Sequence, residues 1–172
     1  SAEQTAVAME GKEKGGVDFM QATPEETFAQ WQAGHGLGGS NAAGDDPDGD
    51  AYPNLLEYAL DMAADSAVHA SPHFYLESKD GNVDAVVRRP LTGRADLTFR
   101  LERSQDMVQW QPVSSAPEVE VINGTGLWRY RQVSLGADKG FYRVSVALDA
   151  DFNGEPEASA TTPVYGFRKM KF

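Results

Sequence analysis

The spacing of hydrophobic positions changes along the chain from a helical period to a strand period. Before about residue 70, apolar residues recur at intervals of three and four, as Phe28 and Trp31 do. A second helical stripe follows Pro53 and consists of Leu55, Leu56, Ala59, Leu60 and Ala63. After residue 70, apolar and polar residues alternate, as in "DLTFRLERS". The first part therefore predicts helices, and the second predicts strands with one buried face.

The stretch "TPEETFAQWQAGHG" carries start and stop signals for the first helix. Thr23 can cap the helix, Pro24 suits its first turn, and Glu26 completes a capping box with Thr23. Gly34 or Gly36 ends it, because glycine adopts the left-handed conformation that terminates helices. The second helix is expected to begin near Pro53.

The alternating part predicts six to eight short strands. Asp80-Gly81-Asn82 and Asn123-Gly124 lie between alternating runs and predict two hairpins. Strands at these spacings favour an antiparallel sandwich or barrel. We therefore predict an α+β fold, in which a short helical hairpin with an EF-hand-like loop precedes an antiparallel β-sandwich. The expected divisions are an arm or linker at 1–22, a helix-loop-helix calcium-binding lobe at 23–66 and the β-sandwich at 67–172.

The charge of the chain is concentrated in its first half. Residues 1–85 hold 3 Lys/Arg and 16 Asp/Glu, which gives −13, and residues 86–172 hold 12 and 10, which gives +2; together these make the net charge of −11. An acidic front half repels nucleic acid and favours cations. Cysteine is absent, which excludes disulfides and thiolate sites. No apolar run reaches the ~18 residues of a membrane helix, so no membrane insertion is expected.

The segment "DDPDGDAYPNLLEYAL" at residues 45–60 places four aspartates in six positions immediately before the second helix. With Asp46 as position 1 of a calcium loop, aspartates fall at positions 3 and 5, and a glutamate falls at position 12 on the following helix. Calcium needs six to eight hard oxygen ligands, which alternate residues of a tight loop can supply. The predicted ligands are Asp46, Asp48, Asp50, the carbonyl of Tyr52, Asn54 and Glu57.

Position 6 of the loop departs from the usual pattern. It is Ala51 instead of glycine, so the turn and the calcium affinity are open, although Gly49 can take up part of the strain. The alternative is a solvated acidic loop whose aspartates only cap the helix. Magnesium suits such a loop less well, because it loses its water reluctantly. A single imperfect loop fits the high calcium outside cells better than the cytosol.

These residues resemble the DPDGDG-x-x-NLLEYAL segment of large secreted and surface proteins of Verrucomicrobia and related bacteria. That segment is similar to the calcium loops of thrombospondin type 3 repeats and dockerins. The flanking "FAQWQAGHGL", "DLTFRLERSQDMVQW" and "GFYRVSV" extend the resemblance over roughly residues 24–146. It implies an extracellular setting and calcium at Asp46, Asp48, Asp50, Asn54 and Glu57, with a β-sandwich near the end of a long chain. It implies no reaction.

A second acidic loop, "DADFNGEPE", begins in the same way. Asp149, Asp151 and Asn153 occupy positions 1, 3 and 5, and Gly154 occupies position 6. Position 12 is Ala160, so the closing glutamate is missing. An ordinary polar loop between two strands is the alternative.

Other candidate chemistry is sparse, and we predict that the chain is not an enzyme. His69 and His73 have a zinc-like spacing, but Pro72 between them breaks a helix. Glu118 and Glu120 could flank a glycosidic bond, yet alternate residues of one strand usually mark its solvent face.

Aromatic and basic residues of the second half leave a binding surface open. Trp110, Trp128, Tyr130, Tyr142 and Tyr165 would form either a sugar-stacking face or part of the core. Several arginines alternate with apolar residues and are expected to face outward, toward acidic glycans, another subunit or solvent; they are Arg88, Arg89, Arg100, Arg103, Arg129, Arg131 and Arg143.

The functional prediction is a secreted, calcium-stabilised structural or interaction module. We expect it to be a subunit or domain of a bacterial cell-surface or extracellular assembly with other protein subunits as partners; the periplasm is an alternative location. The alternative function is a carbohydrate-binding or adhesion module appended to a secreted enzyme, with a glycan as its ligand.

Overall fold

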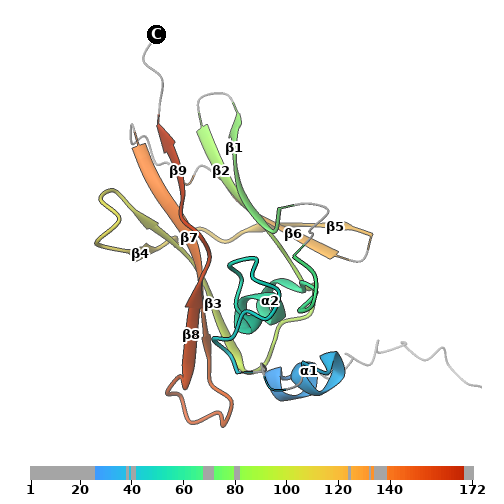
Figure 1. The fold of residues 1–172 in the computed structure, drawn as a ribbon. Coiled ribbons are helices and arrows are strands. Elements are labelled where there is room, and N and C mark those ends of the chain that lie inside the picture. The colour runs from blue at the N-terminus through green and yellow to red at the C-terminus, as the bar shows by residue number, and fades with distance from the viewer. Residues whose placement is uncertain are drawn as a thin grey trace, which may run out of the picture.

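The computed structural model describes residues 26–168, apart from positions 38, 40, 41, 68–71, 80, 81, 124, 132 and 134–138 (Figure 1). The predicted arm at 1–22 lies outside this part of the chain. Two helices and nine strands are present in it. They are α1 (Phe28–His35), α2 (Asn54–Leu60), β1 (Phe74–Lys79), β2 (Asn82–Arg89), β3 (Leu97–Ser104), β4 (Gln111–Pro112), β5 (Glu118–Ile122), β6 (Thr125–Tyr130), β7 (Lys139–Leu148), β8 (Ala158–Thr161) and β9 (Tyr165–Arg168).

The strands form two antiparallel sheets. One sheet has the order β1-β2-β6-β5, and the other has the order β4-β3-β7-β8. Strand β9 also pairs with β7, on the half of β7 that β8 leaves uncovered. The predicted sandwich-like arrangement of antiparallel strands is therefore present.

Both predicted hairpins are confirmed by the strand register. Lys79 pairs with Asn82, so β1 and β2 are joined through positions 80 and 81. Ile122 pairs with Thr125, and Asn123 in the turn has a φ of 51°. That left-handed conformation is the one that two-residue hairpin turns require, and asparagine tolerates it well.

The prediction of an α+β fold with a helical hairpin is wrong, because the chain is mostly β and its two helices are short. They contain 8 and 7 residues. All seven residues of α2 are buried, and the helix contacts β2, β7 and β8. A helix that is buried on every side belongs to a core and cannot form one arm of an amphipathic hairpin. One cluster of buried residues includes both helices and both sheets.

Helix α1 begins later than the capping signals predicted. Its N-cap is Thr27, which forms a capping box with Gln30, while positions 23–25 lie outside the described residues. Its C-cap is Gly36, at a φ of 60°, as the glycine pattern indicated. Phe28 and Trp31 are both buried, and their rings stack with centroids 5.7 Å apart.

A buried carboxylate joins both helices to the start of β3. Asp96 is only 2% exposed; it accepts a hydrogen bond from the Phe28 N–H at 2.7 Å and from the Tyr58 hydroxyl at 2.7 Å. The Tyr58 hydroxyl also lies 2.5 Å from the carbonyl of Glu26. Arg94 bonds to Glu26 and lies over the Tyr58 ring. The negative charge at the N-terminus of α1 suits the helix dipole and satisfies one of its free N–H groups.

The expected outward face of arginines is only partly present. On the outer face of the first sheet, Arg129 pairs with Glu77, and Arg131 pairs with Asp84 and Glu118. Arg89 instead lies on the inner side, where its guanidinium stacks over Phe99 and Trp128.

The aromatic residues do not form an exposed sugar-stacking face. Tyr130 and Tyr142 are buried, and Trp110, Trp128 and Tyr165 are half-buried. Arginine side chains lie over the rings of both tryptophans.

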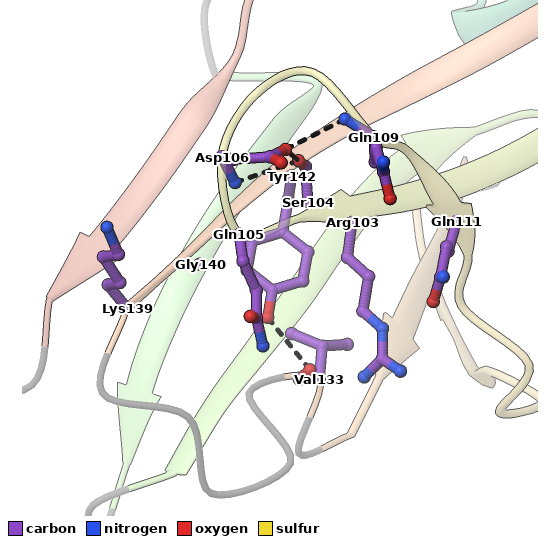
Figure 2. A pocket seen from close by; sticks show the side chains of 10 residues that line it. All are labelled: Arg103, Ser104, Gln105, Asp106, Gln109, Gln111, Val133, Lys139, Gly140 and Tyr142. Atoms are coloured by element: carbon purple, nitrogen blue, oxygen red, sulfur yellow. Dashed lines mark hydrogen bonds between the residues drawn. The ribbon is translucent and has the colours of Figure 1, made fainter.

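A pocket of about 460 Å³ lies where β3 ends and β7 begins (Figure 2). Its walls come from both of these strands, from the turn after β3 and from β4. Among the described helices, none has the length and apolar character needed to cross a membrane.

Tyr58→Phe is predicted to destabilise the fold by about 1–3 kcal/mol, because it leaves the buried Asp96 short of a donor. The midpoint of urea unfolding at an unchanged slope measures this loss. The control is Tyr75→Phe, since the hydroxyl of the half-buried Tyr75 has no hydrogen bond among the described residues. Equal losses in the two variants would contradict the role of Asp96.

Candidate metal centre

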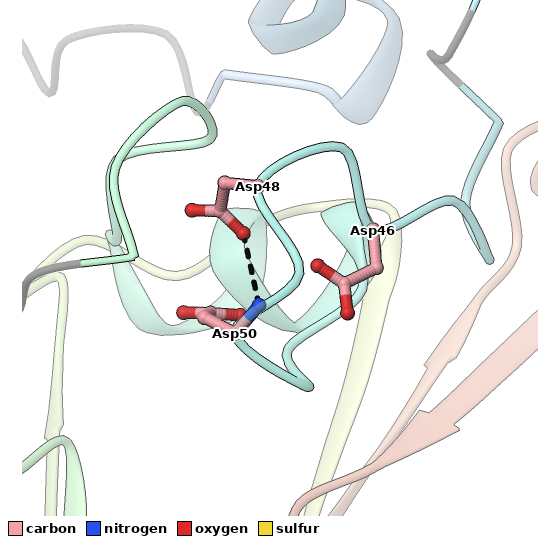
Figure 3. A group of neighbouring side chains, drawn as sticks. All are labelled: Asp46, Asp48 and Asp50. Atoms are coloured by element: carbon pink, nitrogen blue, oxygen red, sulfur yellow. Dashed lines mark hydrogen bonds between the residues drawn. The ribbon is translucent and has the colours of Figure 1, made fainter.

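Three aspartates converge in the loop before α2, as the sequence predicted. Carboxylate oxygens of Asp46, Asp48 and Asp50 all lie within 4.8 Å of one another (Figure 3). They come from alternate residues of one tight loop, and α2 follows directly. Three negative charges at this separation repel one another unless a cation or protons neutralise them.

The backbone of this loop has the left-handed conformation at position 6, where the calcium pattern usually has a glycine. Gly49 and Ala51 have φ values of 75° and 73°, so position 6 takes the left-handed conformation without a glycine. This conformation costs a residue with a Cβ roughly 1–2 kcal/mol. Ala51 therefore strains the turn at the position where the calcium pattern has glycine.

Hydrogen bonds from the loop backbone fix two of these carboxylates in place. Asp46 accepts from the N–H of Gly49 at 2.8 Å and from that of Ala51 at 3.0 Å. Asp50 accepts from the Tyr52 N–H at 2.7 Å. These backbone donors hold the carboxylates of Asp46 and Asp50 in fixed positions within the loop.

Asp48 differs from its neighbours. One of its oxygens accepts a long hydrogen bond of 3.3 Å from the Asp50 N–H, and the other, Oδ2, is buried without a hydrogen-bond partner among the described residues. Burial raises the pKa of Asp48, and the nearby charges of Asp50 and Asp46 raise it further. A buried oxygen with no donor is where a cation would be held most favourably.

Glu57 lies on α2 with its carboxylate in the protein interior. The residue is 0% exposed, and neither side-chain oxygen has a hydrogen-bond partner among the described residues. Burial raises its pKa to about 8, and the charges of Asp48, Asp50 and Asp46 add to the effect. Glu57 is not a member of the 4.8 Å cluster, yet it is close enough for its charge to interact with all three aspartates.

The two remaining predicted ligands also lie beside the loop. Asn54 is 0% exposed; its side-chain N–H donates to the carbonyl of Ala42 at 2.9 Å, and its backbone N–H donates to the carbonyl of Asp45 at 2.8 Å. Tyr52 is half-buried against the core, and burial raises the pKa of its hydroxyl. Coordination by the Tyr52 carbonyl stays a prediction.

The second acidic loop gathers a different set of groups from the one predicted. Asp149, Asp151 and Glu157 place carboxylate oxygens within 4.8 Å of one another, whereas Asn153 bonds to Asp151. Sequence spacing missed Glu157. The pairing of Leu148 with Ala158 brings it opposite Asp149, so the hairpin register was the signal that could have found it.

No carboxylate oxygen of this second cluster is buried without a hydrogen-bond partner among the described residues, whereas Oδ2 of Asp48 in the first cluster is. The carboxylate of Asp149 accepts hydrogen bonds from the N–H groups of Asn153 and Gly154, and the carboxylate of Glu157 accepts one from the N–H of Ala150. Asp151 and Glu157 are exposed to solvent. Water and backbone donors can therefore stabilise its charges without an ion.

Candidate catalytic groups do not converge within the described residues. His35 bonds to the carbonyl of Trp31 at 2.8 Å, and His69 lies outside the described residues. Glu118 and Glu120 are exposed on β5, and Glu118 pairs with Arg131. No protein-family model, curated protein or solved structure matches the chain. The resemblance to the bacterial surface proteins therefore stays a prediction.

In the presence of a chelator, the free energy of unfolding is predicted to fall as the pH rises from about 5 to about 8. Within this window the folded chain keeps a proton on Glu57, whose pKa is about 8, while the unfolded chain, with the ordinary value of 4.5, has released it. The slope is at most about 1.4 kcal/mol per pH unit for one group. Urea unfolding across this range measures it.

Glu57→Gln is expected to flatten this pH dependence, and Glu120→Gln, at an exposed position on β5, is expected to retain it. An identical slope in the Glu57 variant would show that another group titrates.

Proposed function

We propose that this chain is a calcium-stabilised, non-catalytic structural or interaction module that works outside the cell, at a cell surface or in an extracellular assembly. The observation that carries the proposal is the carboxylate of Glu57, which is fully buried, has no hydrogen-bond partner among the described residues and lies next to three clustered aspartates. Burying an ionised carboxylate is costly unless a cation or a hydrogen-bond donor compensates it.

The donor set favours calcium among the metals. The candidate ligands are all oxygens, from four carboxylates and the side chain of Asn54, and hard cations prefer such ligands. Zinc, copper and iron sites in proteins usually include nitrogen or sulfur. Calcium accepts six to eight oxygens in a flexible geometry, whereas magnesium requires a strict octahedron and retains water.

An ion at this site would connect the loop to the core. Asp46, Asp48 and Asp50 belong to the loop, while Glu57 belongs to α2, which contacts β2, β7 and β8. Binding of one ion by both would fasten the loop to the sandwich and remove the repulsion among the four carboxylates. Since the unfolded chain lacks this arrangement, binding stabilises the folded state.

Two features support an extracellular location and an assembly role. The strained turn at Ala51 and the single complete loop suit the millimolar calcium found outside cells. Strand β5 lies at the edge of its sheet and exposes Val119, Val121 and Ile122. An exposed edge with apolar side chains offers both hydrogen bonds and apolar contacts to a further strand.

Calcium is predicted to raise the free energy of unfolding by about 2.7 kcal/mol at a hundredfold excess over its dissociation constant. Calorimetric titration should give about one calcium site per chain, and urea unfolding with calcium and with chelator should give the stability increase. Glu57→Gln removes a charged ligand and should weaken calcium binding at least tenfold.

Asp149→Asn in the second acidic loop serves as the matched control and should leave calcium binding at the first loop intact. If calcium affinity were unchanged in Glu57→Gln but lost in Asp149→Asn, the calcium site would be in the second loop. Stability that does not respond to calcium at all would reject the proposal.

The assembly role predicts that the calcium-loaded chain self-associates through β5. Val121→Lys should return it to a monomer, because a lysine on an edge strand blocks pairing with another strand. Sedimentation velocity at increasing concentration measures this. Val164→Lys, at an exposed apolar position outside β5, is the control and should still associate. A monomer at every concentration would exclude assembly of the chain with itself.

A further inference from the structure

Arg103 occupies a position of β3 where the strand pattern calls for an apolar residue. Leu97, Phe99 and Leu101 precede it at alternate positions and face the core. In the antiparallel register Arg103 lies opposite Tyr142, which belongs to the same core. Directly paired residues point to the same face of a sheet, so Arg103 lies on the inner face of the sandwich, at its end.

The guanidinium of Arg103 points into the pocket between β3 and β7 (Figure 2). It has no ion pair or hydrogen bond within the described part of the chain, and the same holds for Lys139 on the same pocket. Three other arginines of the sandwich, Arg129, Arg131 and Arg143, each pair with a carboxylate. Two cations that have no ion pair among the described residues attract an anion to this pocket.

The carboxylate of Asp106 does not neutralise these cations by direct contact. It accepts hydrogen bonds from the N–H groups of Val108 and Gln109 and from the hydroxyl of Ser104. These donors lower the pKa of Asp106, which therefore carries a charge at neutral pH. A fixed negative charge on the pocket wall repels a doubly charged ligand more strongly than one with a single charge.

The remaining walls favour a ligand with many hydroxyl groups. Gln105, Gln109 and Gln111 offer amide donors and acceptors, while Tyr142 forms an inner wall, with its hydroxyl bonded to the carbonyl of Val133 at 2.9 Å. A volume of about 460 Å³ lies in the range of small-molecule sites, roughly 300–1,000 Å³. Such a lining suits a small polar molecule and not an apolar one.

We propose that this pocket binds a carboxylated sugar, such as a uronic-acid residue of an acidic glycan. Arg103 would bind the carboxylate through two parallel hydrogen bonds, the geometry that guanidinium groups favour, and Lys139 would add a second positive charge. The glutamine amides and the free lone pairs of Asp106 would bind hydroxyl groups. This site is separate from the acidic loop, and its test does not depend on a calcium site there.

Titration calorimetry or ligand-observed NMR on the full chain tests the proposal, with glucuronate, galacturonate and their short oligomers as probes. Glucose and galactose serve as the neutral counterparts, and inorganic phosphate serves as the alternative anion. We expect an acidic sugar to bind saturably. Its neutral counterpart and phosphate should each bind more weakly than the acidic sugar, by roughly tenfold or more. Measurements with calcium and with chelator separate this site from the metal centre.

Arg103→Gln should weaken binding of the acidic sugar at least tenfold, because the substitution removes the positive charge and keeps a hydrogen-bonding side chain. Lys139→Gln provides a second variant at the rim, where loss of folding is not expected. Arg100→Gln is the matched control, since Arg100 is exposed on the opposite face of the same strand. An unchanged melting temperature shows that each variant is folded.

Three results would overturn the proposal: no saturable binding of any acidic sugar up to about 10 mM, equal affinity for phosphate, or equal losses in the Arg103 and Arg100 variants.

Discussion

The buried carboxylate of Glu57 is the constraint to which the rest of the structure responds. It lies on a seven-residue helix that is buried on every side, so its charge cannot reach water without loss of the packing of α2 against the sheets. Burial raises the pKa of Glu57 to about 8, and the charges of the three aspartates next to it add to the effect. A protein that keeps four carboxylates together needs either a proton or a cation among them, and the loop geometry suits a cation.

Two other charged side chains, Asp96 and Arg103, lie in different environments from that of Glu57. Asp96 is also buried, but it is satisfied by the Phe28 N–H and the Tyr58 hydroxyl and so joins the helices to the sheets without an ion. Arg103 shows the reverse situation, a cation on the inner face of the sandwich with no acidic partner among the described residues. Asp96 is satisfied within the protein, whereas Glu57 and Arg103 have no hydrogen-bond or ion-pair partner among the described residues, which is why we propose a ligand for each.

The parts of the fold that depend on local rules could be predicted from the sequence. Alternation identified most of the strands, although not the short β4 and β8, and Asn123 marked a hairpin turn, because these signals involve neighbouring residues. The helical hairpin was wrong because the apolar stripe predicts burial of only one face of α2, and only the tertiary packing shows that all seven of its residues are buried. Asp46, Asp48 and Asp50 were found from spacing within one loop, whereas Glu157 depends on the register of β7 and β8.

The most direct measurement is a crystal structure of the chain grown in millimolar calcium, with the ion identified by its anomalous scattering. We predict one calcium ion within about 2.3–2.6 Å of carboxylate oxygens from Asp46, Asp48, Asp50 and Glu57. A structure without an ion at this place, in which Glu57 is protonated and bonded to an acceptor within the protein, would contradict it.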